Sequence, residues 1–205
     1  LSLSVALPIS ATFVRGAVGE WEKTSGPAGV SGQAGAEIHQ VAVSPQNRAL
    51  ALAAGRSGPF LTPSAGGDWF AVTAAEFAPA GNEWHAAAIH PANPLVMYLS
   101  DENHGLIFRS ADAGASWRRV YAQAGVDGTA GRAHGAKELI ILDASETVYA
   151  GFAQSGLFTD PARPIVPSYG VLKSADGGAT WKALLTGLGG TSLDLVARVV
   201  APTNN

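Results

Sequence analysis

Residues 110–117 read SADAGASW, and residues 174–181 read SADGGATW. Both follow the pattern S-x-D-x-G-x-[ST]-W, and the residues that define it are Ser110, Asp112, Gly114, Trp117, Ser174, Asp176, Gly178 and Trp181. A looser copy at 62–69, TPSAGGDW, keeps Gly66 and Trp69 and has Ser64 at the aspartate position. The weakest copy precedes Trp21, and Trp21, Trp69 and Trp117 recur at an interval of 48 residues. Recurrence at a fixed interval of this length indicates a repeat architecture.

Each residue type in the pattern suits a tight turn between two strands. An aspartate accepts hydrogen bonds from N–H groups of the turn, and a serine bonds across it. The glycine supplies a positive φ at no steric cost. The tryptophan begins the next strand and buries its indole between sheets. We therefore expect these residues to be scaffold and the aspartates to be structural rather than catalytic.

A second landmark lies upstream of each turn: VSPQN at 43–47, IHPAN at 89–93 and LDASE at 142–146, with VAPTN at 200–204 near the end of the sequence. After each of the first three comes an apolar or alternating run, and then a glycine-led run that enters the turn motif. One unit is thus four short strands in about 40–50 residues, which is the period of a propeller blade.

The predicted fold is all-β: one β-propeller domain over residues 1–205, made of four-stranded antiparallel blades. Complete blades are expected at about 37–73, 83–121 and 136–185. A split blade, 1–24 plus 192–200, would close the ring and remove its open edges. Within it, Leu1–Ala11 is interpreted as a strand; the alternative is the end of a signal peptide. Four blades are predicted; the alternatives are a fragment of a six- to eight-bladed propeller and a ring shared by two chains.

The fuller stretch IHPANPLVMYLSDENHGLIFRSADAGASWRRV, residues 89–120, resembles the Asp-box, or bacterial neuraminidase repeat. It is similar to blades of oligoxyloglucan-active glycosidases, sortilin-type receptors and photosystem II assembly-factor propellers. The resemblance implies that the Asp-box turn lies at the periphery of the disc, away from the face that binds ligands. It is specific for a fold and leaves the function open.

Composition excludes several classes of function. Hydrophobic residues make up 47% of the chain, charged residues 14%, and the net charge is −3. The scattered basic residues form no nucleic-acid footprint and no polybasic membrane patch. Without cysteine, neither a disulfide nor a thiolate metal site is possible. The absence of cysteine fits an exported protein, periplasmic or extracellular, and it also fits many cytosolic proteins. No apolar run is long enough to span a bilayer.

Candidate ligand residues lie on the expected innermost strands. Counting back from the landmarks places His39, His85 and Glu138 at one position, and Glu37, Glu83 and Asp194 at the position two residues earlier. Residues two apart on a strand face the same way, so these groups should gather at one mouth of the channel, with Trp84 turned into the core. They would suit a metal, a cationic group or a sugar. The alternative is a set of polar residues where strands meet solvent, and we predict no resident metal or cofactor.

Three further histidines, one long insertion and one glycine-rich loop lie outside the expected strands. His90, His104 and His134 lie in expected turns or loops and are predicted to be solvated. The insertion Ala153–Ser168, with three prolines, is a candidate for covering the disc or contacting a partner. A glycine-rich loop at 125–135 joins two blades.

The favoured function is a non-catalytic interaction or assembly module that docks to a protein partner or a larger complex, including a membrane-associated one. The alternative is a glycoside hydrolase or carbohydrate-binding propeller, whose catalytic carboxylates would come from Glu37, Glu83, Glu138 and Asp194. Such an enzyme needs a carboxylate pair about 5–10 Å apart in an open cleft. A sialidase would also need an arginine cluster and its Arg-Ile-Pro motif, which the sequence lacks.

Overall fold

The computed structural model describes residues 37–78, 83–101, 103–122, 135–142, 145–152 and 171–184. Several sequence-based expectations fall elsewhere. The split blade with Leu1–Ala11, the insertion 153–168, His134, Asp194 and nearly all of the glycine-rich loop lie outside the described residues. The number of blades in the ring therefore stays a prediction.

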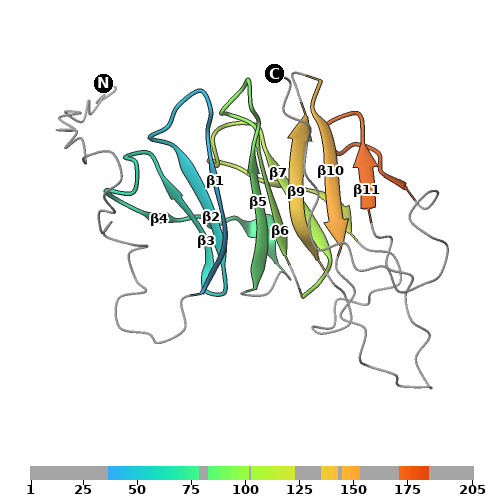
Figure 1. Cartoon of the computed structure of the whole chain (residues 1–205). Coiled ribbons are helices and arrows are strands. Elements are labelled where there is room, and N and C mark those ends of the chain that lie inside the picture. The colour runs from blue at the N-terminus through green and yellow to red at the C-terminus, as the bar shows by residue number, and fades with distance from the viewer. Residues whose placement is uncertain are drawn as a thin grey trace, which may run out of the picture.

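The described chain forms three four-stranded antiparallel sheets, each built from consecutive strands (Figure 1). The first contains β1 (Ile38–Val43), β2 (Ala51–Gly55), β3 (Gly58–Thr62) and β4 (Phe70–Ala71). The second contains β5 (Trp84–Ile89), β6 (Met97–Asp101), β7 (Leu106–Ser110) and β8 (Arg118–Ala122). The third contains β9 (Ala136–Leu142), β10 (Thr147–Phe152), β11 (Val171–Ser174) and β12 (Lys182–Ala183). The all-β prediction with antiparallel four-stranded sheets is confirmed.

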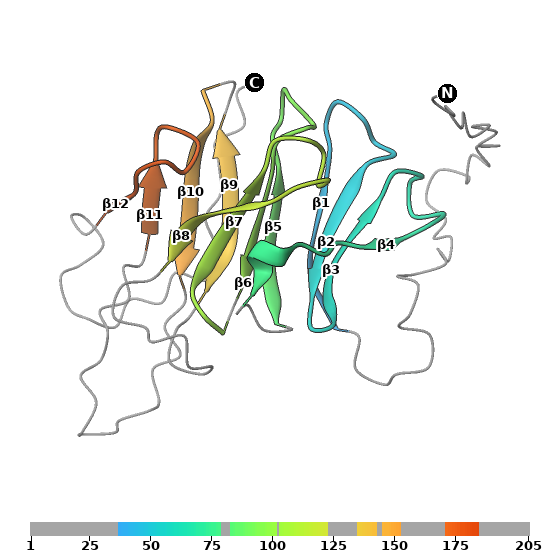
Figure 2. The same ribbon diagram turned by 180° about the vertical axis from the view of Figure 1, so that it is seen from behind.

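The sheets stand side by side, so that the first strand β5 of the middle sheet contacts both β1 and β9. The outer strands β4, β8 and β12 lie on the other side, as Figure 2 shows. Alanines make the close approach of the first strands possible: Ala86, Ala87 and Ala88 of β5 are all nearly inaccessible to solvent. A short 3-10 helix, η1 (Ala75–Phe77), follows β4. Within the described ranges no helix has the length and apolar character needed to cross a bilayer.

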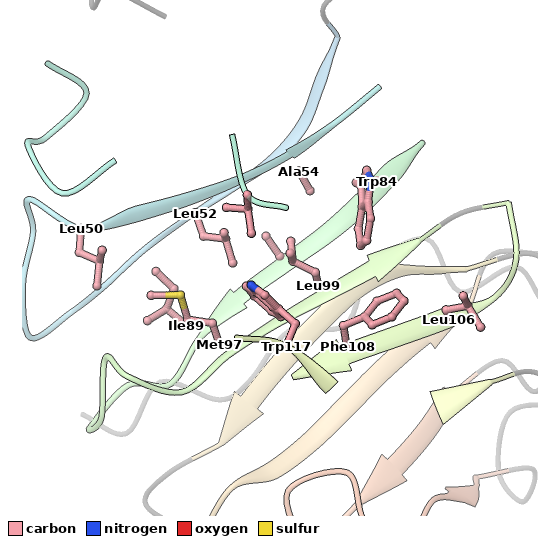
Figure 3. Packing of buried hydrophobic residues seen from close by; sticks show 12 residues of the cluster. Leu50, Leu52, Ala54, Trp84, Ile89, Met97, Leu99, Leu106, Phe108 and Trp117 are labelled. Atoms are coloured by element: carbon pink, nitrogen blue, oxygen red, sulfur yellow. The ribbon is translucent and has the colours of Figure 1, made fainter. Parts of the chain in front are cut away.

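Two hydrophobic cores fill the spaces between the sheets. The first joins Leu52 and Ala54 to side chains of the second sheet that include Leu99 and Trp117 (Figure 3). Phe77 of η1 seals it, with its ring 4.6 Å from that of Trp84 and 5.0 Å from that of Phe108. Trp84 is 3% exposed, which confirms its predicted place in the core.

The second core lies between the second and third sheets, and its residues are Ala86, Ala88, Val96, Tyr98, Ile107, Ala136, Leu139, Ile141, Val148, Ala150, Phe152 and Leu172. Outside this core an ion pair also links the two sheets. Arg109 Nη2 lies 2.8 Å from Glu146 Oε2, and Arg109 Nε also donates to the Tyr98 hydroxyl at 3.2 Å. Apolar and polar contacts thus both fix the sheets against each other.

The turns between the third and fourth strands have the hydrogen bonds that the sequence pattern suggests. Ser110 Oγ accepts the Gly114 N–H at 2.9 Å and donates to Asp112 Oδ1 at 2.8 Å. Asp112 also accepts from the N–H and the hydroxyl of Ser116. The third sheet repeats this arrangement with Ser174, Asp176 and Thr180. The hydroxyl and N–H of Thr180 lower the pKa of Asp176 from 3.8 to about 2, because both donate to its ionised form.

The looser copy in the first sheet reaches a similar turn with different atoms. Thr62 Oγ1 accepts the Gly66 N–H at 2.9 Å, and Ser64 Oγ accepts the Asp68 N–H at 2.8 Å. Ser64 thus takes over one of the three hydrogen bonds that the aspartate accepts in the stronger copies, the one from the backbone N–H four residues later. The turn tolerates serine there because one short side-chain oxygen is enough to hold the backbone N–H.

Candidate functional site

The candidate ligand residues lie at the end of the sheets opposite to the S-x-D-x-G turns. In the second sheet, Ile89 pairs with Met97 and Met97 with Ser110, so the turn motif is at the end where β5 finishes. Trp84, beside His85, pairs with Asp101 at the other end, where β5 begins. The same holds for β1, so Glu37, His39, Glu83 and His85 lie at the starts of neighbouring first strands (Figure 1).

Each first strand has a β-bulge near its start. In β1, Ile38 pairs with Gly55 and Gln40 with Ala54, which leaves His39 as the extra residue. In β5 the register skips His85, and in β9 it skips Lys137. A bulge releases one side chain from the alternation of the strand and re-aims it. His39, His85 and Lys137 are therefore structurally equivalent, and we call them the bulge residues.

The equivalence corrects the predicted alignment of the third blade. Counting back from Ala144 placed Glu138 with His39 and His85, but the pairing places Lys137 there and Glu138 with Gln40. The third turn is one residue shorter: Val148 follows Ile141 after seven residues, whereas Ala51 follows Val43 after eight. For the same reason the counterpart of Glu37 and Glu83 is Gly135 rather than Ala136.

His39 links the first two sheets. Its Nε2 lies 2.9 Å from Glu83 Oε1, and its Nδ1 lies 4.0 Å from Glu37 Oε1. An ionised carboxylate only accepts hydrogen bonds, so Nε2 carries the proton of the shorter contact. The other oxygen of Glu83 lies 3.5 Å from Nε of Arg56, which sits in the turn between β2 and β3. Arg56 is 62% exposed, so this last pair contributes little to stability.

The two imidazoles stack face to face. The ring centroids of His39 and His85 are 4.1 Å apart and the ring planes differ by 9°. Burial lowers the pKa of His85 from 6.5 to about 4, and the nearby Lys137 and His39 act in the same direction. His85 is therefore a neutral imidazole at pH 7. Its lone pair is available to a donor, whereas Nε2 of His39 is occupied by Glu83.

Parallel stacking argues against a shared metal. A metal ion binds in the plane of an imidazole ring, along the lone pair of its nitrogen, and two parallel planes do not converge on one such point. Among the residues that the structure describes, no group of three histidine, aspartate or glutamate side chains has the arrangement of a metal site.

Gln40 connects all three sheets. Its Oε1 accepts the Ala87 N–H of β5 at 2.9 Å, and its Nε2 donates to Glu138 Oε1 of β9 at 3.3 Å. β5 is the edge strand of its sheet, so the Gln40 amide satisfies a backbone donor that the sheet leaves open. Ala86 is the counterpart of Gln40 and Glu138 in the middle sheet, and its methyl group leaves room for this bridge.

Sequence reasoning missed three residues of the site: Gln40, Arg56 and Lys137. Gln40 and Arg56 belong to no repeated pattern, and their roles arise from contacts between sheets. Lys137 was the neighbour of a predicted residue, and only the length of the third turn could have revealed its equivalence to the histidines.

The prediction that His90 and His104 are solvated is wrong. His90 is 2% exposed, and its Nδ1 accepts the N–H groups of Ala92 and Asn93 in the turn after β5. Ser44 has the same role in the first sheet, where its Oγ accepts the Asn47 N–H. His104 is 7% exposed and its Nδ1 lies 2.9 Å from Oδ2 of the buried Asp101. Both imidazoles are buried because they supply acceptors or donors that their turns need.

Neither a family model nor a curated protein sequence matches the chain. Several solved structures match the chain. The GH74 xyloglucanase from Xanthomonas campestris is 20% identical with a TM-score of 0.53, and the alignment covers 73% of this chain and 23% of the enzyme. The GH74 enzyme of Niastella koreensis is 18% identical with a TM-score of 0.53, and the alignment covers 72% of this chain and 22% of the enzyme. YCF48 from Cyanidioschyzon merolae is 13% identical with a TM-score of 0.52 over 73% of this chain and 40% of its own.

The chain thus spans less than half the length of each of these proteins. At such identities the likeness concerns the fold alone. Sheet topology, turn geometry and structural likeness agree on one conclusion: the described part of the chain has the blades of a β-propeller, similar to those of GH74 enzymes and of YCF48.

Proposed function

We propose that this chain is a non-catalytic propeller module that docks a protein partner or a larger complex through the end where β1, β5 and β9 begin. The supporting observation is how the carboxylates are used there. Glu83 is held by His39 and Arg56, and Glu138 accepts from Gln40. Glycoside hydrolysis needs one carboxylic acid and one carboxylate placed on either side of a substrate bond. Carboxylates that tie sheets together suit a polar recognition surface better.

The likeness to YCF48 supports docking as well. One of the matching structures is YCF48 bound to D1 peptide, and it is 13% identical to this chain with a TM-score of 0.51. A propeller with similar blades therefore does bind a protein segment. We extend this to a protein partner of the present chain and, on the absence of cysteine, to an exported location.

A carbohydrate is the second candidate ligand. The likeness to the GH74 xyloglucanase and the three acidic side chains Glu37, Glu83 and Glu138 at one end of the blades favour it. In this alternative, the same end of the blades would bind or cleave a glycan, and Asp194 would be the fourth carboxylate.

Charge reversal of exposed residues tests the docking surface. Glu37 and Arg56 have 61% and 62% of their side chains exposed, so E37R and R56E change the surface and leave the core intact. Arg48 is an exposed arginine in the turn at the opposite end of the same sheet, and R48E is the matched control. The tagged chain is purified from its native source in each form, and proteins present in stoichiometric amount are quantified.

We expect one partner to be retained with R48E and lost with E37R/R56E. Deletion of 157–168 should also weaken it if that insertion contributes. A panel of glycans incubated with the unmodified chain is the second arm. Release of reducing sugar that disappears with Glu37→Gln or Glu138→Gln would refute the proposal and favour the glycosidase alternative. Loss of the partner with R48E alone would place the interface elsewhere.

A further inference from the structure

Two arginines lie opposite each other on neighbouring strands of the second sheet. Arg109 of β7 pairs with Arg118 of β8, in a row that continues to Tyr98 of β6. Burial raises the pKa of the Tyr98 hydroxyl, while the nearby charges of Arg109 and Arg118 act in the opposite direction. Like charges directly opposite each other destabilise a sheet. The pair therefore costs stability unless another group compensates it.

The same row has a different character in each of the three sheets. The residue before the turn motif and its partner on the outer strand are Leu61 and Phe70 in the first sheet. In the third sheet they are Lys173 and Lys182. The first sheet shows that apolar residues can occupy both positions in this fold. The like-charged pairs of the second and third sheets are thus no requirement of the strands themselves.

Only one of the two arginines has a compensating charge. Nε and Nη2 of Arg109 donate to Glu146, and Nε also donates to Tyr98, so this guanidinium is held in one orientation. Its Nη1 donates to no residue that the structure describes. Arg118 is exposed, and it forms neither a hydrogen bond nor an ion pair with the described part of the chain. A fixed guanidinium with two unused N–H groups thus lies beside one that is wholly unused.

A small pocket lies where the two arginines meet the turn of the second sheet. Its volume is about 110 Å³, and its lining residues are Arg109, Ala111, Ser116, Trp117 and Arg118. No carboxylate lines it: Asp112 of the same turn accepts from the hydroxyls of Ser110 and Ser116 instead. Pockets that enclose a whole small molecule measure about 300–1,000 Å³. This pocket is therefore large enough only for the end of a side chain or a similar group.

The charge of the pocket selects the class of group that it binds. Glu146 neutralises Arg109, so the two arginines together carry one uncompensated positive charge. One carboxylate balances that charge, and its two oxygens match the planar N–H fork of a guanidinium. A phosphate group carries a charge of about −1.5 to −2 and would be repelled by Glu146. We propose that the pocket binds the carboxylate of an aspartate or glutamate side chain on a protein partner, with Arg109 Nη1 and the Arg118 guanidinium as donors. The pocket lies beside the S-x-D-x-G turn, at the other end of the blades from the docking end proposed above, and it does not depend on that proposal.

Arg119 provides a matched control for the test. It is exposed like Arg118, but it pairs with Phe108, so its side chain points to the opposite face of the sheet. NMR follows a titration of the full chain with a hexaglutamate peptide, and the Nε–H signal of Arg118 and the indole N–H signal of Trp117 should shift and saturate. R118Q should weaken binding at least about fivefold, the value of one ordinary hydrogen bond. R119Q removes the same charge and should weaken it much less. Equal weakening by the two variants would mean general electrostatic attraction and would overturn the proposal.

Thermal unfolding separates binding from a structural role of Arg118. Without peptide, R118Q should unfold at the same temperature as the unmodified chain or a higher one, because the change removes the repulsion from Arg109. With peptide, the unmodified chain should gain more stability than R118Q, since only it has the complete pocket. Unfolding of R118Q well below the unmodified chain would make Arg118 a structural residue and contradict the proposal. Tighter, Arg118-dependent binding of a phosphoserine peptide of the same length would overturn the assignment to a carboxylate.

Discussion

Adding one methyl group at two equivalent glycines isolates the contact between the second and third sheets. Gly114 and Gly178 occupy the same position of their turns, with φ of +88° and +87°. A Cβ at Gly114 would be 3.7 Å from its nearest neighbour, Trp117 Cζ2, which is ordinary contact. A Cβ at Gly178 would be 3.0 Å from Val120 Cβ and 3.1 Å from Val120 Cγ2 in the neighbouring sheet.

These distances give different expected losses. Placing alanine at a positive φ costs about 1–2 kcal/mol, and this applies to both G114A and G178A. Forcing a methyl group into a filled core costs a further 1–3 kcal/mol or so, and this applies to G178A alone. We therefore expect G178A to be less stable than G114A by about 1–3 kcal/mol, the overpacking difference alone.

Urea unfolding followed by tryptophan fluorescence measures the difference, provided that the denaturant slope is the same in both variants. The V120A background is the control. V120A removes the two methyl groups and keeps the Val120 Cβ, so it should reduce the extra loss of G178A in part and leave the loss of G114A unchanged, since coupling is confined to residues in contact. Equal losses for the two alanines, or an extra loss that V120A leaves undiminished, would refute the packing of Val120 against the third turn.

Three further predictions follow from single contacts. Lowering the pH from 6.5 to about 4 should reduce the free energy of unfolding, because in this range the unfolded His85 ring takes up a proton before the folded ring does. NMR should place the pKa of His85 near 4, and K137Q should raise this pKa. An unchanged pKa in K137Q would contradict the role of Lys137. E146Q should cost about 1–3 kcal/mol in urea unfolding, because it weakens the charged hydrogen bonds that Arg109 makes across the sheets; a loss equal to that of the exposed control E76Q would refute it. S110A should cost about 1–3 kcal/mol, because the Gly114 N–H loses its acceptor; a neutral result in thermal unfolding would mean that the turn does not depend on that bond.

The fold was readable from the sequence because the turn residues have local causes. Ser110, Asp112 and Gly114 bond to one another within five residues, so their identities are visible as a pattern wherever the turn occurs. Trp84 could likewise be assigned to the core from strand alternation. Nothing beyond neighbouring residues is needed for either inference.

The candidate site was only partly readable, since it depends on register and on contacts between sheets. Glu37, His39, Glu83 and His85 do lie together as predicted, because two blades share the same spacing to their turns. Glu138 was assigned to the wrong position because the third turn is one residue shorter, which shifts the count back from the landmark by one; the bulge is common to all three strands and does not. Gln40 and Arg56 act on residues of other sheets, and a sequence contains no local trace of that.

The buried histidines show a second limit of prediction from sequence. His90 and His104 stand in turns, where a polar residue is ordinarily solvated, yet both are bonded inside the fold: His90 Nδ1 accepts two backbone N–H groups of its turn, and His104 Nδ1 pairs with the buried Asp101 carboxylate. Ser44 accepts the equivalent turn N–H, that of Asn47, with a much smaller side chain than that of His90. The burial of these histidines could not be predicted from the residue type, because their partners are groups of the fold itself: turn N–H groups for His90 and the Asp101 carboxylate for His104.

The bulge in each first strand has a consequence for engineering. A bulge residue is excluded from the pairing of its strand, so the backbone places few demands on its side chain, and histidine at 39 and 85 coexists with lysine at 137. The three positions are structurally equivalent and lie at the same end of the three sheets. Libraries that vary them together should return folded proteins far more often than libraries at the neighbouring core positions, and they offer a compact way to give this scaffold a new specificity.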